Sequence, residues 1–249
     1  MGKMLRSTEK RKEHYNKLID DTLKKLINLF GDHLLSVSSF LQTACKAKPT
    51  LLIQLDRPIG VLLKNDAVSQ NIKKIKSMLK EASDCVIIIT TAGEIADFAD
   101  DFPMEHIHIR NRYRKLYGDD PIGQMEVSFE NIQRAVKSSM QSVLMRLRTA
   151  YLSQNYNDLF VKETVEQLYP TFECALYLRS QSIPTGFQEL VFKIESCYNT
   201  KNSVLSEIAQ SIENGATTGL YQKMFGLLTA LEEILAGVKG LKGLSPEEV

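Results

Sequence analysis

The residues best suited to bind a phosphate or a nucleobase stand together near the middle of the chain. Three arginines and a lysine alternate there with a tyrosine: Arg110, Arg112, Tyr113, Arg114 and Lys115. Arginine side chains donate paired hydrogen bonds to phosphate oxygens, and aromatic rings stack on bases. The cluster is therefore a candidate binding site for a nucleotide, a phosphate or a partner. The simpler interpretation is a solvated helix face neutralised by Asp119 and Asp120.

Two histidines lie just before this cluster. Residues 104–109 are expected to form a strand, which would place His106 and His108 on one face together with Arg110. Two such histidines could hold one transition metal ion. The sequence offers no third ligand near them, so polar side chains on an open sheet face are the simpler interpretation. No metal or other cofactor is predicted.

The composition excludes several classes of protein. Of the 249 residues, 43% are hydrophobic and 24% are charged, as in globular chains and unlike disordered ones. The formal net charge is +1, so no overall field attracts nucleic acid or an anionic membrane. The four cysteines are far apart and lack zinc-ligand spacing. The charged N-terminal stretch and the absence of a long apolar run predict a cytoplasmic protein without a membrane partner.

The first half of the chain is expected to be an α/β domain. Apolar residues recur every three or four positions at 7–30 and at 69–80, which predicts two helices. Short apolar or alternating runs predict three strands ahead of the histidine strand, at Leu34–Phe40, Leu51–Leu55 and Cys85–Ile89. This order of elements predicts a mixed sheet with helices packed against it.

After Gly118 no further strand is expected. Ser128 is a predicted N-cap for a long helix that ends near Gln154. Four more helical segments follow, at 159–179, 187–197, 203–212 and 219–238. Short connections indicate an antiparallel bundle, so the predicted fold is α+β, with an α/β domain at 1–120 and an all-helical domain at 121–249. The apolar segment 221–238 is expected to be buried in this bundle; the alternative is a homodimer interface.

The order of elements and several local sequences resemble the DNA polymerase β-type nucleotidyltransferase superfamily, and most closely its small prokaryotic members with a helical C-terminal domain. Residues 34–37 resemble their first strand, and residues 51–56 resemble their second. Residues 102–109 with 116–121 resemble the segment that follows, and residues 144–152 resemble the first helix of the C-terminal domain. The resemblance covers most of the chain and implies a nucleotidyltransferase-like mixed sheet in the N-terminal domain.

The catalytic motif of that superfamily is missing from this sequence. Its members hold a triphosphate with a Gly-Ser turn and bind divalent metal ions with an Asp-x-Asp pair. The resemblance places the Gly-Ser turn at Leu41 and Gln42, and the two aspartates at Lys48 and Thr50. A lysine repels a metal ion, and a threonine hydroxyl is a weak neutral ligand. No acid lies within residues 34–55, so a shifted alignment does not restore the motif.

Three functions follow as hypotheses. The first is a catalytically inactive nucleotidyltransferase-like protein that binds a nucleotide, a nucleic acid or a protein partner, which accounts for the resemblance and the missing motif together. The second is an active transferase with a non-standard metal site, in which Glu105, Asp56 or a residue of the helical domain replaces the lost ligands. A lone Glu105 is better interpreted as a surface or salt-bridged acid. The third is an interaction subunit without a ligand pocket, and it ranks between the other two.

Overall fold

A computed structural model describes residues 2–41, 49–62, 77, 80, 85–216 and 218–241, and it describes the backbone alone for residues 2–14, 41 and 96. The chain forms two compact units that interleave in sequence. The sheet unit contains Met1–Ala99 and Arg112–Met125, and the helical unit contains Asp100–Asn111 and Glu126–Val249. The predicted division at residue 120 is simpler than this arrangement, because residues 100–111 lie with the helices that follow them.

The sheet unit contains every described strand. Its elements in chain order are α1 (Gly2–Phe30), the 3-10 turn η1 (Gly31–His33), β1 (Leu34–Leu41), β2 (Pro49–Leu55), α2 (Ile59–Leu62), β3 (Val86–Thr91), α5 (Ala92–Asp101), β4 (Arg114–Gly118) and α7 (Pro121–Gln124). The first helix and the first three strands are confirmed, with ends that differ by a few residues. The helix predicted at 69–80 lies outside the described residues except for Ser77 and Lys80, which are both helical.

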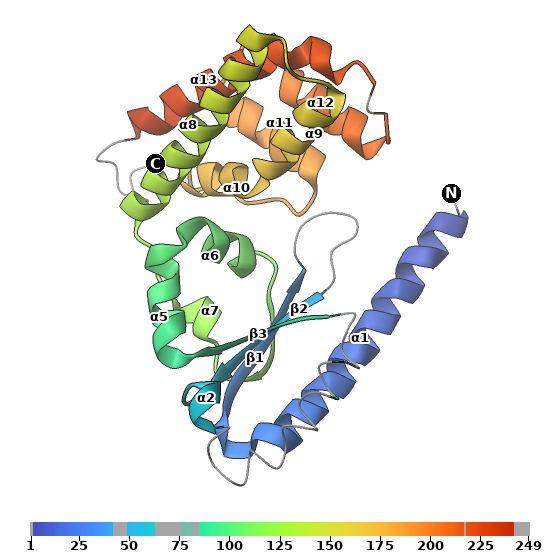
Figure 1. The fold of residues 1–249 in the computed structure, drawn as a ribbon, viewed down its shortest axis with the longest axis vertical. Coiled ribbons are helices and arrows are strands. Elements are labelled where there is room, and N and C mark those ends of the chain that lie inside the picture. Colours follow the sequence, from blue (N-terminus) through green and yellow to red (C-terminus); the bar gives the residue numbers. More distant parts are fainter. Residues whose placement is uncertain are drawn as a thin grey trace. The chain divides into compact units, whose positions relative to one another are not determined.

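The four strands form one mixed sheet in the order β3-β2-β1-β4. β1 pairs antiparallel with both β2 and β4, whereas β2 pairs parallel with β3. The predicted mixed sheet with flanking helices is therefore confirmed. Figure 1 shows α1 along one side of this sheet and α7 on the other side.

The side of the sheet that faces α1 carries the hydrophobic core of the unit. Val37, Leu51 and Ile53 from the two central strands are fully buried there, and Leu26 and Phe30 of α1 pack in the same cluster. Burial of a side chain of this size stabilises a fold by about 1.5–3 kcal/mol. The apolar face of the amphipathic helix α1 therefore packs on the apolar face of the central strands.

The helical unit begins with a helix that sequence reasoning assigned to a strand. Its elements in chain order are α6 (Pro103–Arg110), α8 (Phe129–Ser153), α9 (Asp158–Gln167), α10 (Tyr169–Tyr177), α11 (Phe187–Cys197), α12 (Val204–Glu213), the 3-10 turn η2 (Leu220–Lys223) and α13 (Met224–Gly240). With the sheet unit, they make an α+β protein with a helical second part, as predicted. None of the described helices is long and apolar enough to cross a membrane.

Local sequence signals fix the ends of these helices. The Ser128 hydroxyl accepts a hydrogen bond from the Asn131 amide at the start of α8, and Gln154 ends that helix with a φ of 51°. The single helix predicted at 159–179 is wrong, because α9 and α10 meet at Leu168. Pro170 lies in the first turn of α10, where its missing N–H leaves no intrahelical bond unmade.

The apolar stripe of the last helix is buried within the helical unit. Leu227, Leu231 and Ile234 have no exposed surface, so burial explains most of the segment that was also considered as a dimer interface. Tyr221 and Phe225 are the exceptions, since both side chains are exposed. The apolar stripe of α13 therefore belongs to the core, whereas Tyr221 of η2 and Phe225 in the first turn of α13 point away from it.

The strand predicted at 104–109 is wrong, because these residues form α6. Pro103 starts the helix, and Ile107 is buried in the hydrophobic core of the helical unit. Packing against α10 stabilises a helix there, although isoleucines at alternate positions favour a strand.

Conversely, β4 was not predicted. It is a short edge strand that begins with Arg114 and Lys115, and charged residues are typical of such edges.

Candidate functional site

The face of the sheet opposite the α1 core is unusually polar at its centre. Directly paired residues of neighbouring strands project from the same face. Ser38 of β1 pairs with Leu52 of β2 and with Lys115 of β4, and Ser36 pairs with Gln54. These side chains alternate with Val37 and its neighbours, which face α1. We call this surface, defined by Ser36, Ser38, Thr50, Gln54 and Lys115, the polar face.

Two of these side chains form a hydrogen bond with each other. The Ser36 hydroxyl donates to Oε1 of Gln54 at 2.9 Å, and both residues are buried. The bond joins the two central strands on the polar face, between residues 18 positions apart in sequence. Because both groups are shielded from water, breaking this bond would leave a buried amide oxygen unsatisfied. This pair is therefore a structural element of the sheet.

The hydroxyls of Ser38 and Thr50, on the same face, form no comparable hydrogen bond in the described structure. Ser38 is 2% exposed and Thr50 is fully buried, yet neither hydroxyl has a hydrogen-bond partner in the described structure. A buried polar group without a partner destabilises a fold by about 1–3 kcal/mol. Thr50 pairs with Phe40 across the strands, two residues along the register from the pair of Ser38 and Leu52. The two hydroxyls thus lie near each other on one face, with donor and acceptor capacity that the fold leaves unused.

Thr50 is also one of the positions at which the resemblance places a metal-binding aspartate. Its hydroxyl is neutral and belongs to the polar face, so it brings no charge to a cation. Leu41 ends β1, and Gln42 and Lys48 lie outside the described residues. Among the described residues, no group of three histidines, cysteines or acids could hold a metal ion. The residues present do not fit a two-metal centre.

Asp56, the nearest acid after β2, interacts with Arg57 and His33. Its carboxylate accepts a hydrogen bond from Nη2 of Arg57 at 2.7 Å and lies 3.1 Å from Nδ1 of His33. The Arg57 hydrogen bond, with a smaller effect of His33, lowers the pKa of Asp56 to about 2. Asp56 follows the last residue of β2, whereas Thr50 lies at its beginning. It is therefore no substitute for a missing carboxylate beside Thr50.

Two further acids of the sheet unit cap helices. Glu94 accepts hydrogen bonds from the Thr91 amide and hydroxyl at the start of α5, and these bonds lower its pKa. This reciprocal arrangement is a capping box. Asp120 accepts a bond from the Gly123 amide at 2.9 Å and so caps α7. Both carboxylates serve local structure.

The basic cluster predicted from the sequence is divided by the fold. Arg110 ends α6 in the helical unit, whereas Arg114 and Lys115 begin β4 in the sheet unit. The Tyr113 hydroxyl donates to Asp120 at 2.8 Å, so its polar end is occupied, and Arg112 is half-buried. The interpretation of the cluster as a solvated helix face is wrong for Arg114 and Lys115, because these residues form a strand. Lys115 pairs with Ser38 at the edge of the polar face, where the register of β1 and β4 shifts.

The two histidines have separate environments on α6. His106 is fully buried, neither ring nitrogen has a partner in the described structure, and burial followed by the charge of Arg110 lowers its pKa to about 4. His108 lies with Nδ1 2.5 Å from the buried carboxylate of Glu173 on α10. Two positions along a helix place these side chains on nearly opposite sides of it, which replaces the shared strand face that was predicted for them. Glu105 is an exposed residue of the same helix.

Two arginines of α8 form side-chain hydrogen bonds at the surface of the helical unit. Arg146 donates to Gln167 at 2.8 Å, and Arg148 donates to Glu232 at 2.7 Å. The buried thiol of Cys174 has a pKa raised well above its usual value, first by burial and then by Glu173 and Glu105. A protonated, buried thiol is a poor nucleophile. These residues therefore offer no catalytic group.

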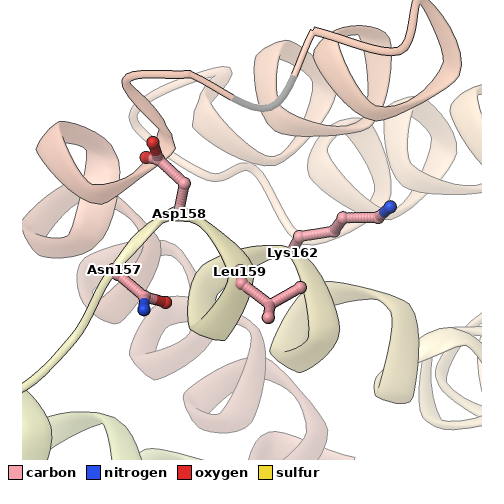
Figure 2. Close-up of a pocket in the computed structure, with 4 residues that line it drawn as sticks. All are labelled: Asn157, Asp158, Leu159 and Lys162. Atoms are coloured by element: carbon pink, nitrogen blue, oxygen red, sulfur yellow. The ribbon is translucent and has the colours of Figure 1, made fainter.

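An open depression of about 400 Å³ lies at the start of α9. Figure 2 shows the four residues that line it: Asn157, Asp158, Leu159 and Lys162. Asn157 caps the helix through a 2.9 Å bond to the Phe160 amide, and Asp158 accepts bonds from the amides of Gly219 and Tyr221. The polar groups that line the depression are thus largely used in hydrogen bonds within the fold. The depression therefore lacks the convergent free polar groups of a ligand site.

Sequence reasoning noticed the alternating serines of β1 but did not identify them as a site. The alternation of Ser36 and Ser38 with Val37 indicated a strand with one polar face. The pairing of Ser36 with Gln54, which distinguishes the used hydroxyl from the unused one, depends on strand register. A buried serine pair in the centre of a sheet could have been suspected from the pattern, but its neighbours could not.

Comparison with known proteins returns little. No protein-family model matches the chain, and no curated protein matches its sequence. Among solved structures, the chain is similar to a spectinomycin adenyltransferase from Enterococcus faecialis, solved with ATP and spectinomycin. The two share 12% sequence identity with a TM-score of 0.48, over 87% of this chain and 99% of the other.

Proposed function

We propose that this chain is a non-catalytic, nucleotidyltransferase-like protein whose sheet unit binds a nucleotide without a divalent metal ion. The observation that carries the proposal is the pair of buried hydroxyls, Ser38 and Thr50, that lack hydrogen-bond partners in the described structure. A buried polar group without a hydrogen bond destabilises the folded state. The presence of two such groups therefore favours a ligand that forms the missing hydrogen bonds. The sequence resemblance and the order of elements supply the class of ligand.

The chemistry of the polar face suits phosphate oxygens better than a cation. A hydroxyl donates one hydrogen bond, and Lys115, which pairs with Ser38 across β1 and β4, supplies positive charge beside them. Carboxylates that would hold a metal ion between protein and phosphate are not found on the described part of this face. Exposed Val86 and Ile88 of β3 lie beyond Thr50 and Leu52 in the same rows and offer an apolar surface to a base or sugar.

The proposal is tested by isothermal titration calorimetry of the purified chain with ATP, CTP, GTP and UTP, each with and without magnesium. We expect at least one nucleotide to bind with an affinity that magnesium leaves unchanged. Binding that requires magnesium would overturn the proposal and indicate an active transferase with substitute carboxylates. Failure of all four nucleotides to bind would also overturn it and favour an interaction subunit.

Paired variants connect binding to the polar face. Ser38→Ala together with Thr50→Val removes both unused hydroxyls while keeping the shape of the side chains. Each lost hydrogen bond is worth about 1 kcal/mol, so we expect affinity to fall roughly 10- to 30-fold. Ser39→Ala is the control, because Ser39 pairs with Leu51 on the α1 side of the same strand. Equal affinity of the double variant and the control would place the ligand elsewhere.

A further inference from the structure

The helical unit exposes a group of apolar side chains that its own core does not use. They come from the end of α8, the start of α9 and the first turns of η2 and α13, and their exposed fractions run from 38% to 82%: Tyr151, Leu152, Leu159, Tyr221 and Phe225. We call this surface the aromatic patch. Single exposed apolar residues are ordinary, but a contiguous group of this size marks an interaction surface.

Contacts between the elements show that the patch is continuous. The rings of Tyr151 and Phe225 have centroids 6.3 Å apart, although they lie on different helices. Tyr221 lies one helical turn before Phe225, and its amide is tied to Asp158, the residue next to Leu159. The depression at the start of α9, which Leu159 also lines, therefore borders the patch (Figure 2).

We propose that the aromatic patch is the interface of a homodimer, in which a second copy of this chain covers the same five side chains. Side chains of these types bury about 150–250 Å² when fully covered, so five at these exposures present on the order of 500 Å² of apolar surface. A stable interface of standard size buries about 800 Å² on each partner, including a polar rim. The patch supplies the apolar centre of such an interface.

The charges beside the patch favour a second copy over a strongly charged partner. Arg148 is paired with Glu232 at 2.7 Å, and Lys162 lies 3.9 Å from Glu166 one turn along α9. Each of these four charges thus has an opposite charge beside it. Two identical neutral surfaces meet without like-charge repulsion, whereas an acidic or basic partner would find no complementary field. Two-fold symmetry places the same patch on both sides of the interface.

The proposal concerns the helical unit and is independent of nucleotide binding. Its test is sedimentation velocity and light scattering of the full chain from low to high micromolar concentration. We expect a dimer for the natural sequence. The double variant Leu152→Glu with Phe225→Glu should be monomeric, with dimer affinity reduced at least about 100-fold, because it buries two unpaired charges at the centre of the interface.

Phe192→Glu provides a matched control, because Phe192 is 63% exposed, close to the 66% of Phe225, on α11, which packs on α10 and α12. This variant should remain dimeric. Leu152→Glu alone, at the most exposed position of the patch, should weaken the dimer without affecting the fold, as an unchanged far-ultraviolet circular dichroism spectrum would show. A monomeric natural chain, a dimer that survives the double variant, or a dimer that Phe192→Glu disrupts equally would each overturn the proposal.

Discussion

Buried polar side chains are used differently in the two units of this protein. In the helical unit, buried acids complete the ends or packing of helices, as Glu195 does for α12 and Glu173 does beside His108. In the sheet unit, Ser38 and Thr50 are buried with no partner in the described structure. The difference indicates that buried polarity alone does not identify a site. A candidate site is identified instead by buried polar groups that form no hydrogen bond within the fold.

Glu195 illustrates the structural use in detail. Helix α12 begins after Ser203, whose side chain forms no capping bond, so the first amides of the helix need another acceptor. Glu195 of α11 supplies it: its carboxylate accepts from the amides of Leu205 and Ser206 and from the Ser206 hydroxyl. A negative charge at the N-terminus of a helix is further stabilised by the helix dipole. One side chain thus fixes two helices to each other.

The largest expected effect tests this use. Glu195→Ala removes the cap and leaves two amides of α12 without an acceptor, so we expect the free energy of unfolding of the helical unit to fall by about 3 kcal/mol. Urea unfolding followed by circular dichroism measures it. Glu189→Ala on the same helix is the control, because the Glu189 side chain is 62% exposed and should lose little. Equal losses in the two variants would show that Glu195 is no more structural than a surface acid.

His106 is a buried polar side chain of the helical unit whose ring nitrogens have no hydrogen-bond partner in the described structure, and it gives the second prediction. Its folded-state pKa is about 4, below the ordinary value of 6.5, because the buried ring resists protonation and Arg110 lies nearby. Between pH 6.5 and 4 the unfolded chain therefore binds a proton that the folded chain does not. The free energy of unfolding should fall across this window as pH falls, by on the order of 2 kcal/mol.

The measurement compares urea unfolding of the natural chain and of His106→Leu at several pH values between 7 and 4. The variant has no titrating group at this position, so its stability should decline less over the window. His33→Gln changes a partly exposed histidine of the sheet unit and should leave the decline intact. Parallel pH profiles for the natural chain and His106→Leu would rule out His106 as the source.

The sequence predicted the helical unit better than the sheet unit, for physical reasons. The helix at 187–197 was placed at its observed ends, and α8 was found from its cap and its apolar stripe, because both signals are local. Residues 104–109 were misassigned because burial of Ile107 among distant helices outweighs its preference for a strand. β4 escaped detection because an edge strand of five residues has little periodicity of its own.

The candidate site was even less predictable. The alternating serines of β1 were visible, but the partner of each hydroxyl was not. Ser36 finds Gln54 because the antiparallel register of β1 and β2 brings them together, and Ser38 finds the apolar Leu52 instead. Such distinctions depend on long-range pairing, which no local pattern encodes.

The smallest expected effect is the sharpest test of the comparison, because it uses two serines of one strand. Ser36→Ala breaks the bond to Gln54 and leaves its buried oxygen unsatisfied, so we expect a loss of about 1–2 kcal/mol. Ser38→Ala removes a hydroxyl without a partner, so stability should be unchanged or rise by up to about 1 kcal/mol. Hydrogen exchange of the β1 and β2 amides reports both changes within the sheet unit.

When the nucleotide that binds is added, Ser38→Ala should have the larger effect and Ser36→Ala the smaller one. If the unused hydroxyl contacts the ligand, Ser38→Ala weakens the ligand's protection of the β1 and β2 amides, while Ser36→Ala leaves the gain in protection on binding near its natural value. A loss of stability in ligand-free Ser38→Ala equal to that of Ser36→Ala would mean that Ser38 is a structural residue. Buried polar side chains would then have a structural role in both units, and the polar face would no longer be a candidate site.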